Sequence, residues 1–183
     1  MKKALYILGL LDDKDLDWFA GSGKKRTLES GHIIIQEGQP SMFLYFILSG
    51  TVSVSVKGRR VAEIGQGEVM GEISLLDSRP PSATLKAESP TELLAISFDS
   101  LRSKLSRDAP FAARLYQALG TFLAQRLRSV NVQLIVGDAA KVDRATEENE
   151  ADEIDPEFLE KITLAGSRFR WILEKLGASK GTI

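Results

Sequence analysis

The sequence predicts a mainly β fold, a compact barrel or roll of short strands with helices on both sides of it along the chain. Between about residues 24 and 97 the apolar pattern has a period of two, as in Thr51-Val52-Ser53-Val54-Ser55-Val56. Outside this stretch, the apolar period is that of amphipathic helices. Turns between short strands favour glycine, and seven glycines interrupt the stretch: Gly31, Gly38, Gly50, Gly58, Gly65, Gly67 and Gly71.

Length and composition exclude several classes of function. The chain has 183 residues and a net charge of −1, which fits one domain with an appendage and argues against binding nucleic acid through overall charge. The absence of cysteine excludes disulfides, thiolate zinc sites and cysteine-ligated iron–sulfur clusters. The one histidine, His32, lies in an apolar stretch and is expected to be a packing or surface residue, so no metal or haem site is expected.

A first helix is predicted over residues 4–20, ending at Gly21-Ser22-Gly23. No segment approaches the ~20 apolar residues that span a bilayer, and the N-terminal apolar run lacks a small-residue cleavage site. The sequence therefore predicts no membrane span and a cytoplasmic protein. The helix is expected to turn five apolar residues toward a core: Leu5, Leu8, Leu11, Leu16 and Phe19.

Seven or eight strands are expected between residues 24 and 97. The alternation in residues 51–56 predicts a strand with one buried face. Residues 32–36 and 42–48 are more continuously apolar, as expected of strands that are covered on both sides.

Two helices are predicted to follow the strands. Asp99 is expected to cap a short helix over residues 100–106, and a longer one is expected over residues 108–136, with Pro110 in its first turn and Gly137 as its stop. Its first half carries core positions, namely Phe111, Leu115, Leu119 and Phe122. Its second half carries steps of four, three and four residues that predict a homodimer seam: Leu123, Leu127, Val130 and Leu134.

The C-terminal part changes in character. Residues 138–157 carry nine acidic residues against two basic ones, which indicates a solvated linker between a domain of residues 1–137 and a tail of residues 158–183. An amphipathic helix over residues 158–177 is too short to fold alone, so it must dock on this chain, on a second copy or on a protein partner. Its apolar line is Leu159, Ile162, Gly166, Phe169, Leu173 and Leu176.

The segment from Gly71 to Leu85 is the most informative for chemistry. A glycine and Glu72 follow a strand, a short apolar helical turn comes next, and a proline-bearing corner leads to Ser82 and Thr84. Unpaired N–H groups at such a corner suit an anionic oxygen, and Glu72 can accept hydrogen bonds from sugar hydroxyls. The residues alone therefore fit an anion or nucleotide pocket, and the alternative is a turn in which the glutamate simply caps backbone.

This segment resembles the phosphate-binding cassette of cyclic nucleotide-binding domains, the family of the catabolite activator protein, protein kinase A regulatory subunits and cyclic-nucleotide-gated channels. Gln36-Glu37-Gly38 and the stretch Tyr45–Val52 resemble the family's roll. Leu8-Gly9-Leu10-Leu11 with Leu16 resembles its N-terminal helix. The resemblance covers about residues 1–136 and implies a cyclic nucleotide-binding β-roll, a jelly-roll-like double-stranded β-helix.

The resemblance implies a ligand, cAMP or cGMP, and residues that hold it. Glu72 would bind the ribose 2′-hydroxyl, while the region of Ser82 and Ala83 would hold the cyclic phosphate. If the long helix closes over the pocket, Gln125, Arg126 or Ser129 would touch the base. The whole expected site is Gly71, Glu72, Ile73, Ser74, Arg79, Ser82, Ala83 and Thr84.

One departure from the family pattern stands at Pro81, where the family has an arginine that pairs with the phosphate. A hydrogen bond to a charged group contributes ~1.5–3 kcal/mol, so its loss is expected to weaken binding at least about tenfold. Arg79 is two residues upstream and is the candidate substitute, although Pro80 and Pro81 stiffen the corner.

Two functions stay open at this point. One is a sensor that binds a cyclic nucleotide or related phosphorylated ligand and signals through its long helix to a dimer or partner interface. The other is an interaction scaffold with a degenerate pocket. No nucleophile–base pair is visible, so no enzyme is expected. A winged helix-turn-helix does not fit into the 46 residues after Gly137, so direct DNA binding is not expected.

Overall fold

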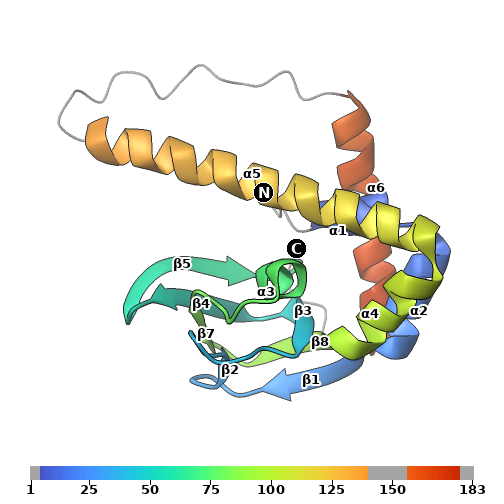
Figure 1. Cartoon of the computed structure of the whole chain (residues 1–183), viewed down its shortest axis with the longest axis horizontal. Helices are drawn as coiled ribbons and strands as arrows, with labels where there is room; N and C mark the ends of the chain where they lie inside the picture. The colour runs from blue at the N-terminus through green and yellow to red at the C-terminus, as the bar shows by residue number, and fades with distance from the viewer. Residues whose placement is uncertain (1–4, 140–155, 178–183) are drawn as a thin grey trace.

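The computed structural model describes residues 5–139 and 156–177, and within them the side chains of residues 7–128 and 163–177. Two four-stranded antiparallel sheets form a roll, with strand orders β1-β8-β3-β6 and β2-β7-β4-β5 (Figure 1). The predicted mainly β class with flanking helices is confirmed. The strands are β1 (Lys24–Leu28), β2 (Ile33–Ile35), β3 (Phe43–Ser49), β4 (Thr51–Val56), β5 (Arg59–Gly65), β6 (Val69–Met70), β7 (Thr84–Ala87) and β8 (Thr91–Ser97).

The strand β3 is buried on both faces, as its continuous apolar run predicts. Tyr45 and Ile47 belong to an apolar cluster inside the roll, whereas Leu44, Phe46 and Leu48 belong to a second cluster under the helices. The same expectation is wrong for β2, because β2 is an edge strand. Of its three isoleucines Ile35 alone is buried, and Ile33 is 49% exposed.

The predicted single N-terminal helix is in fact two helices, α1 (Leu5–Leu10) and α2 (Asp13–Ser22). Asp12 adopts an extended conformation, which interrupts the helix, and it is the N-cap of α2. The two residues form a capping box: the Asp12 carboxylate accepts from Asp15 N and the Asp15 carboxylate accepts from Asp12 N, both at 3.0 Å. The predicted apolar residues Leu8, Leu11, Leu16 and Phe19 are buried, while the side chain of Leu5 lies outside the described residues.

The next helices differ from prediction at their ends. After α3 (Glu72–Asp77), α4 (Phe98–Arg107) is capped by Ser97, whose hydroxyl accepts from Ser100 N at 3.2 Å, and not by Asp99. α5 (Ala109–Ala139) contains Pro110 in its first turn, as expected, and runs through Gly137. One glycine costs a helix only about 1 kcal/mol, so Gly137 does not stop it.

The tail helix α6 (Pro156–Lys175) packs on α1 and α2 of the same chain, the first of the three predicted alternatives (Figure 1). Phe169 and Leu173 are buried there as expected, together with Ala165 and Ile172. The ends of the predicted linker are helical, since 138–139 belong to α5 and 156–157 to α6, and its remaining residues lie outside the described ranges. Leu159 and Ile162 have no described side chains. Among residues 5–139 and 156–177, no helix has the length and hydropathy to cross a membrane.

Candidate functional site

A glycine turn introduces the candidate site. β6 ends at Met70, and Gly71 has a φ of +87° before α3 begins with Glu72. A Cβ at Gly71 would lie 2.5 Å from the carbonyl oxygen of Phe43, which is closer than any side chain tolerates. Both the left-handed backbone and the tight contact require glycine at this position, and together they aim the first turn of α3 into the roll.

The site is a narrow cavity of about 60 Å³ at the open end of the roll. Its polar wall comes from the start of α3 and from the corner at Ser82 and Ala83, and one residue of α5, Arg126, closes it. The remaining walls are mainly apolar side chains of the strands, and alternation turns most of them inward: Ile35, Val54, Ile64, Val69, Met70 and Leu85.

Glu72 and Arg126 form an ion pair across this cavity. Arg126 Nη1 donates to Glu72 Oε1 at 2.8 Å, with the glutamate side chain 3% exposed and the arginine side chain 43% exposed. Burial raises the pKa of Glu72 above its ordinary value, and the positive charge of Arg126 opposes that rise. The arrangement gives a buried carboxylate with one partly solvated cation on it, at a position where a ligand hydroxyl can donate to the same carboxylate.

The proline corner is tied to the turn between β2 and β3. Gly38 N donates to the carbonyl of Pro81 at 2.9 Å, and Glu37 N donates to Thr84 Oγ1 at 3.1 Å. The Thr84 hydroxyl also accepts from Gln36 Nε2 at 3.3 Å. Its hydrogen bonds therefore stabilise the turn, and Thr84 does not line the cavity.

Six of the eight predicted site residues line the cavity: Gly71, Glu72, Ile73, Ser74, Ser82 and Ala83. Besides Thr84, Arg79 is the other residue that the structure does not bring there. Its side chain is exposed, and its N–H donates to Asp77 Oδ1 at 2.9 Å, which turns the chain outward after α3. Arg79 therefore does not replace the arginine that Pro81 lacks in this conformation.

Of the three residues suggested on the long helix, Arg126 is the one that reaches the cavity. Gln125 is half-buried beside it without lining it, and the side chain of Ser129 lies outside the described residues. The inward strand residues were missed as site residues, although the period of two contains the signal for which side chains face the interior. In the part of the chain that the structure describes, no three metal-ligating side chains gather.

Comparisons with known proteins agree with this geometry. Residues 25–108 match the model of the cyclic nucleotide-binding domain. The cyclic AMP receptor protein of Thermus thermophilus is 33% identical over 129 residues, covering 68% of this chain and 58% of that protein. A cGMP-dependent protein kinase of Eimeria tenella is 38% identical over 76 residues, covering 42% of this chain and 8% of the kinase. The chain thus spans less than two thirds of either relative.

Among solved structures, the N-terminal domain of a transcriptional regulator from Streptomyces coelicolor is 32% identical. That likeness covers 70% of this chain and 90% of the other, with a TM-score of 0.56. The residues that match the family model, 25–108, contain the strands of the roll and the Gly71 turn. On these grounds the chain belongs to the cyclic nucleotide-binding domain family.

Proposed function

We propose that this chain is a cytoplasmic, non-enzymatic sensor that binds a cyclic nucleotide or a related phosphorylated ligand in the Glu72 cavity. The observation that carries the proposal is the ion pair between Glu72 and Arg126, because it joins the ligand-binding carboxylate to the helix that leaves the roll. A ligand hydroxyl that takes the carboxylate changes the contact that holds α5. The relatives named for cAMP and cGMP support this class of ligand.

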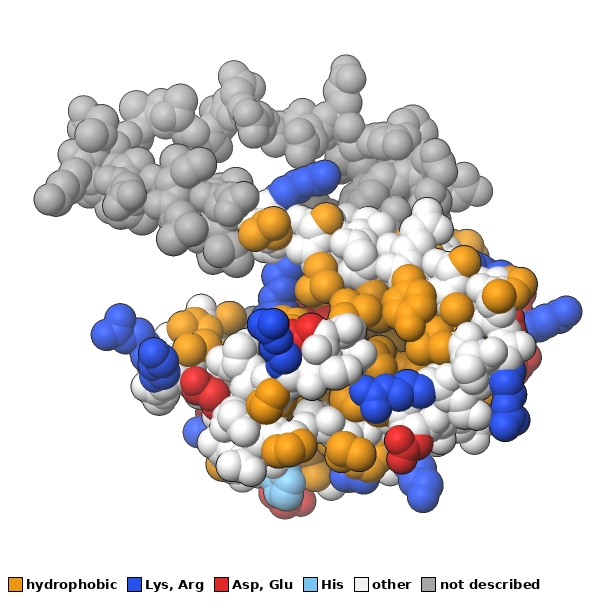
Figure 2. Space-filling view, viewed as in Figure 1, with side chains coloured by type: hydrophobic (Ala, Val, Ile, Leu, Met, Phe, Trp, Pro, Cys, Tyr) orange, Lys and Arg blue, Asp and Glu red, His pale blue; other side chains and the backbone are white. Residues whose placement is uncertain are grey.

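The signal is proposed to pass through α5 to a homodimer interface. Apolar side chains gather along α5 and between it and α4 (Figure 2). Leu127 is 62% exposed, while Leu123 is half-buried against the core, and Val130 and Leu134 have no described side chains. Tyr116 of the same helix is 50% exposed, and two exposed apolar side chains on a helix that also touches the cavity fit an interface between copies.

The alternative is a scaffold whose pocket takes no ligand, and two observations favour it. Pro81 supplies no charge at the corner, and the cavity of about 60 Å³ has space for about two waters. The alternative predicts that substitution of Glu72 leaves the binding of a protein partner to the domain unchanged.

Calorimetric titration of the purified chain with cAMP and with cGMP, carried to millimolar ligand, tests the proposal. We expect one-to-one saturation that disappears in Glu72→Ala and persists in Glu63→Ala, a control on the exposed strand β5. Absence of heat with both nucleotides contradicts the proposal. If Pro81→Arg then restores binding, the pocket is degenerate and the scaffold is the correct function.

A further inference from the structure

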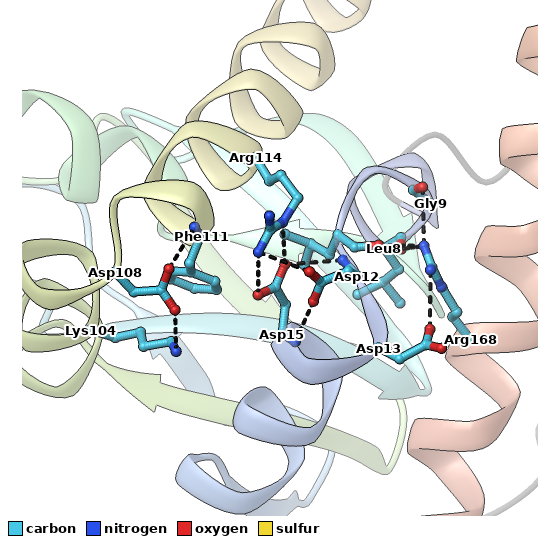
Figure 3. Close-up of polar contacts among 11 residues, drawn as sticks. Leu8, Gly9, Asp12, Asp13, Asp15, Lys104, Asp108, Phe111, Arg114 and Arg168 are labelled. Carbon is cyan, nitrogen blue, oxygen red and sulfur yellow. Dashed lines mark hydrogen bonds and ion pairs between the residues drawn. The ribbon is translucent and has the colours of Figure 1, made fainter.

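The turn between α1 and α2, residues 11–12, and the first turn of α2 are held by arginines from two other helices (Figure 3). From α5, Arg114 Nε and Nη2 donate to the two oxygens of Asp15 at 2.7 and 3.0 Å, and Nη2 also lies 3.0 Å from Asp12 Oδ2. From α6, Arg168 Nη1 donates to the carbonyls at the end of α1. Thus both α5 and α6 are anchored to one short turn.

The contact of Arg168 is a helix cap supplied from a distance in sequence. Its Nη1 lies 3.1 Å from the carbonyl oxygen of Leu8 and 3.2 Å from that of Gly9, and it also donates to that of Leu11. Carbonyls in the last turn of a helix have no intrahelical donor. A cation there stabilises α1 in two ways, by hydrogen bonds to these carbonyls and by its favourable interaction with the negative end of the helix dipole. Its second contact, to Asp13 at 3.1 Å, adds little, since the Asp13 side chain is 90% exposed.

The apolar face of α6 completes the core beneath α1 and α2. Phe169 and Ile172 pack against Phe19, Phe46 and Leu94, and no room for a water remains in the crevice among them. The same apolar cluster contains Phe111 and Leu115 at the beginning of α5. α6 is therefore packed into the layer that positions the first turns of α5, and α1 contacts both helices.

The cavity is too small for a nucleotide in this conformation, and we infer that Arg126 and the part of α5 that carries it move when a ligand enters. Sites for small ligands have volumes of ~300–1,000 Å³, against about 60 Å³ here. Among the described residues that line the cavity, Arg126 alone comes from α5, while the others belong to the roll and to α3. Arg114 and Arg126 are twelve residues apart on one helix, or ~18 Å along its axis, so a rigid-body shift of α5 at Arg126 would also displace its anchored end.

We propose that α6 is an intramolecular strap, and that its docking on α1 and α2 opposes entry of the ligand at Glu72. α6 fixes α1, α1 and Asp15 fix the start of α5, and α5 places Arg126 on the carboxylate. A ligand that displaces Arg126 moves α5 away from the position in which α6 packs best. Because such coupling is reciprocal, release of α6 favours the ligand and the ligand favours release of α6. The direction of this coupling rests on the proposed function of the cavity.

The first experiment is titration of Arg168→Gln with cAMP, with Arg170→Gln on the exposed side of the same helix as the control. We expect Arg168→Gln to bind cAMP at least about fivefold more tightly than the wild type, which is the lower end of ordinary coupling. The control is expected to bind as the wild type does. An affinity that is unchanged or lower in Arg168→Gln overturns the proposal.

The second experiment needs no ligand and separates failure of the strap from failure of the proposed function. Hydrogen exchange of the α6 amides is compared in the wild type, in Arg126→Gln and in Arg128→Gln, an exposed control two residues along α5. Exchange in β3 and β8 reports global opening. We expect α6 to exchange faster in Arg126→Gln alone. If no variant binds a nucleotide but α6 still loosens, the strap stands and the ligand assignment fails. Unchanged exchange of α6 rejects the strap.

Discussion

Arg126 and Glu72 are 54 residues apart in sequence, and 2.8 Å separate their side-chain atoms across the mouth of the roll. The glutamate belongs to the turn after β6, and the arginine to the helix that leaves the roll. This single pair therefore joins the part of the chain that would recognise a ligand to the part that can report it. Among the described residues that line the cavity, the charges also balance, because Arg126 is the one cation and Glu72 is the one carboxylate.

Gly71 is predicted to be irreplaceable for backbone reasons. Gly71→Ala is expected to lower the free energy of unfolding by about 3 kcal/mol, from a left-handed non-glycine residue together with the overlap with the Phe43 carbonyl. Gly58→Ala is the matched control, because Gly58 has a φ of +75° with open space around it, and about 1 kcal/mol is expected there. Urea unfolding measures both. Equal losses would mean that the contact with Phe43 relaxes freely.

Restoring a cation at the corner is predicted to raise the affinity for cAMP. Pro81→Arg is expected to bind at least about tenfold more tightly than the wild type, because Pro81 lines the cavity and a charged hydrogen bond contributes ~1.5–3 kcal/mol. Pro80→Arg, at the exposed neighbouring position, is the control in the same titration. An equal gain from both substitutions would mean that general charge, rather than a contact in the cavity, is responsible.

Leu127 is predicted to be central to self-association. Leu127→Glu is expected to yield monomers in sedimentation equilibrium, since burying a carboxylate in an apolar seam is strongly unfavourable. Arg128→Glu, which is exposed at the adjacent position of α5, is expected to leave the dimer intact. A wild-type monomer, or a dimer that survives Leu127→Glu, contradicts the proposed homodimer interface.

The Asp15–Arg114 pair is predicted to make stability depend on pH. Burial acts to raise the pKa of Asp15, but hydrogen bonds from Arg114 and Asp12 N more than offset it and hold that pKa below its ordinary value. Because its folded-state pKa is lowered, Asp15 stabilises the folded protein at pH values above its ordinary pKa of ~3.9. This contribution is lost as the pH falls through the folded-state pKa.

Arg114→Gln is accordingly expected to cost on the order of 3 kcal/mol at pH 7, because it leaves a buried carboxylate without its partner. The cost should shrink as the pH falls below the ordinary carboxyl value of ~3.9 and on through the lowered folded-state pKa of Asp15. Urea unfolding from pH 3 to pH 7 measures it. Arg60→Gln, which breaks an exposed pair with Glu63, should change stability by less than ~1 kcal/mol at any pH. A cost for Arg114→Gln that is independent of pH would assign the effect to packing.

Local pattern predicts the roll well, because each strand's alternation and each glycine turn is contained in a few neighbouring residues. The break at Asp12 was missed for a physical reason: Leu8, Leu11 and Leu16 keep one helical phase across it, so periodicity does not detect the capping box. The cap of α4 shows the same weakness, as Ser97 and Asp99 are both good caps and tertiary packing decides between them.

The residues of the candidate site likewise fall into those that a local motif predicts and those that depend on tertiary packing. Glu72 and Ser82 follow from the motif, and six of the eight predicted residues line the cavity. The side of α5 that faces the cavity depends on how the helix lies on the roll, which one sequence does not specify. For this reason Arg126 could be suggested but not distinguished from its neighbours, and the failure of Arg79 to reach the corner follows from a turn at Asp77 that spacing does not reveal.

The doubly buried strand β3 makes the two layers of this domain share one wall. Tyr45 and Ile47 belong to the cluster that also contains the cavity residues Ile35 and Met70, whereas Leu44 and Phe46 bear on the helices. Successive residues along β3 thus contact the cavity cluster and the helical cluster in turn. We therefore expect a change in the volume of the cavity to alter the packing of the helices, because a single strand separates the two clusters.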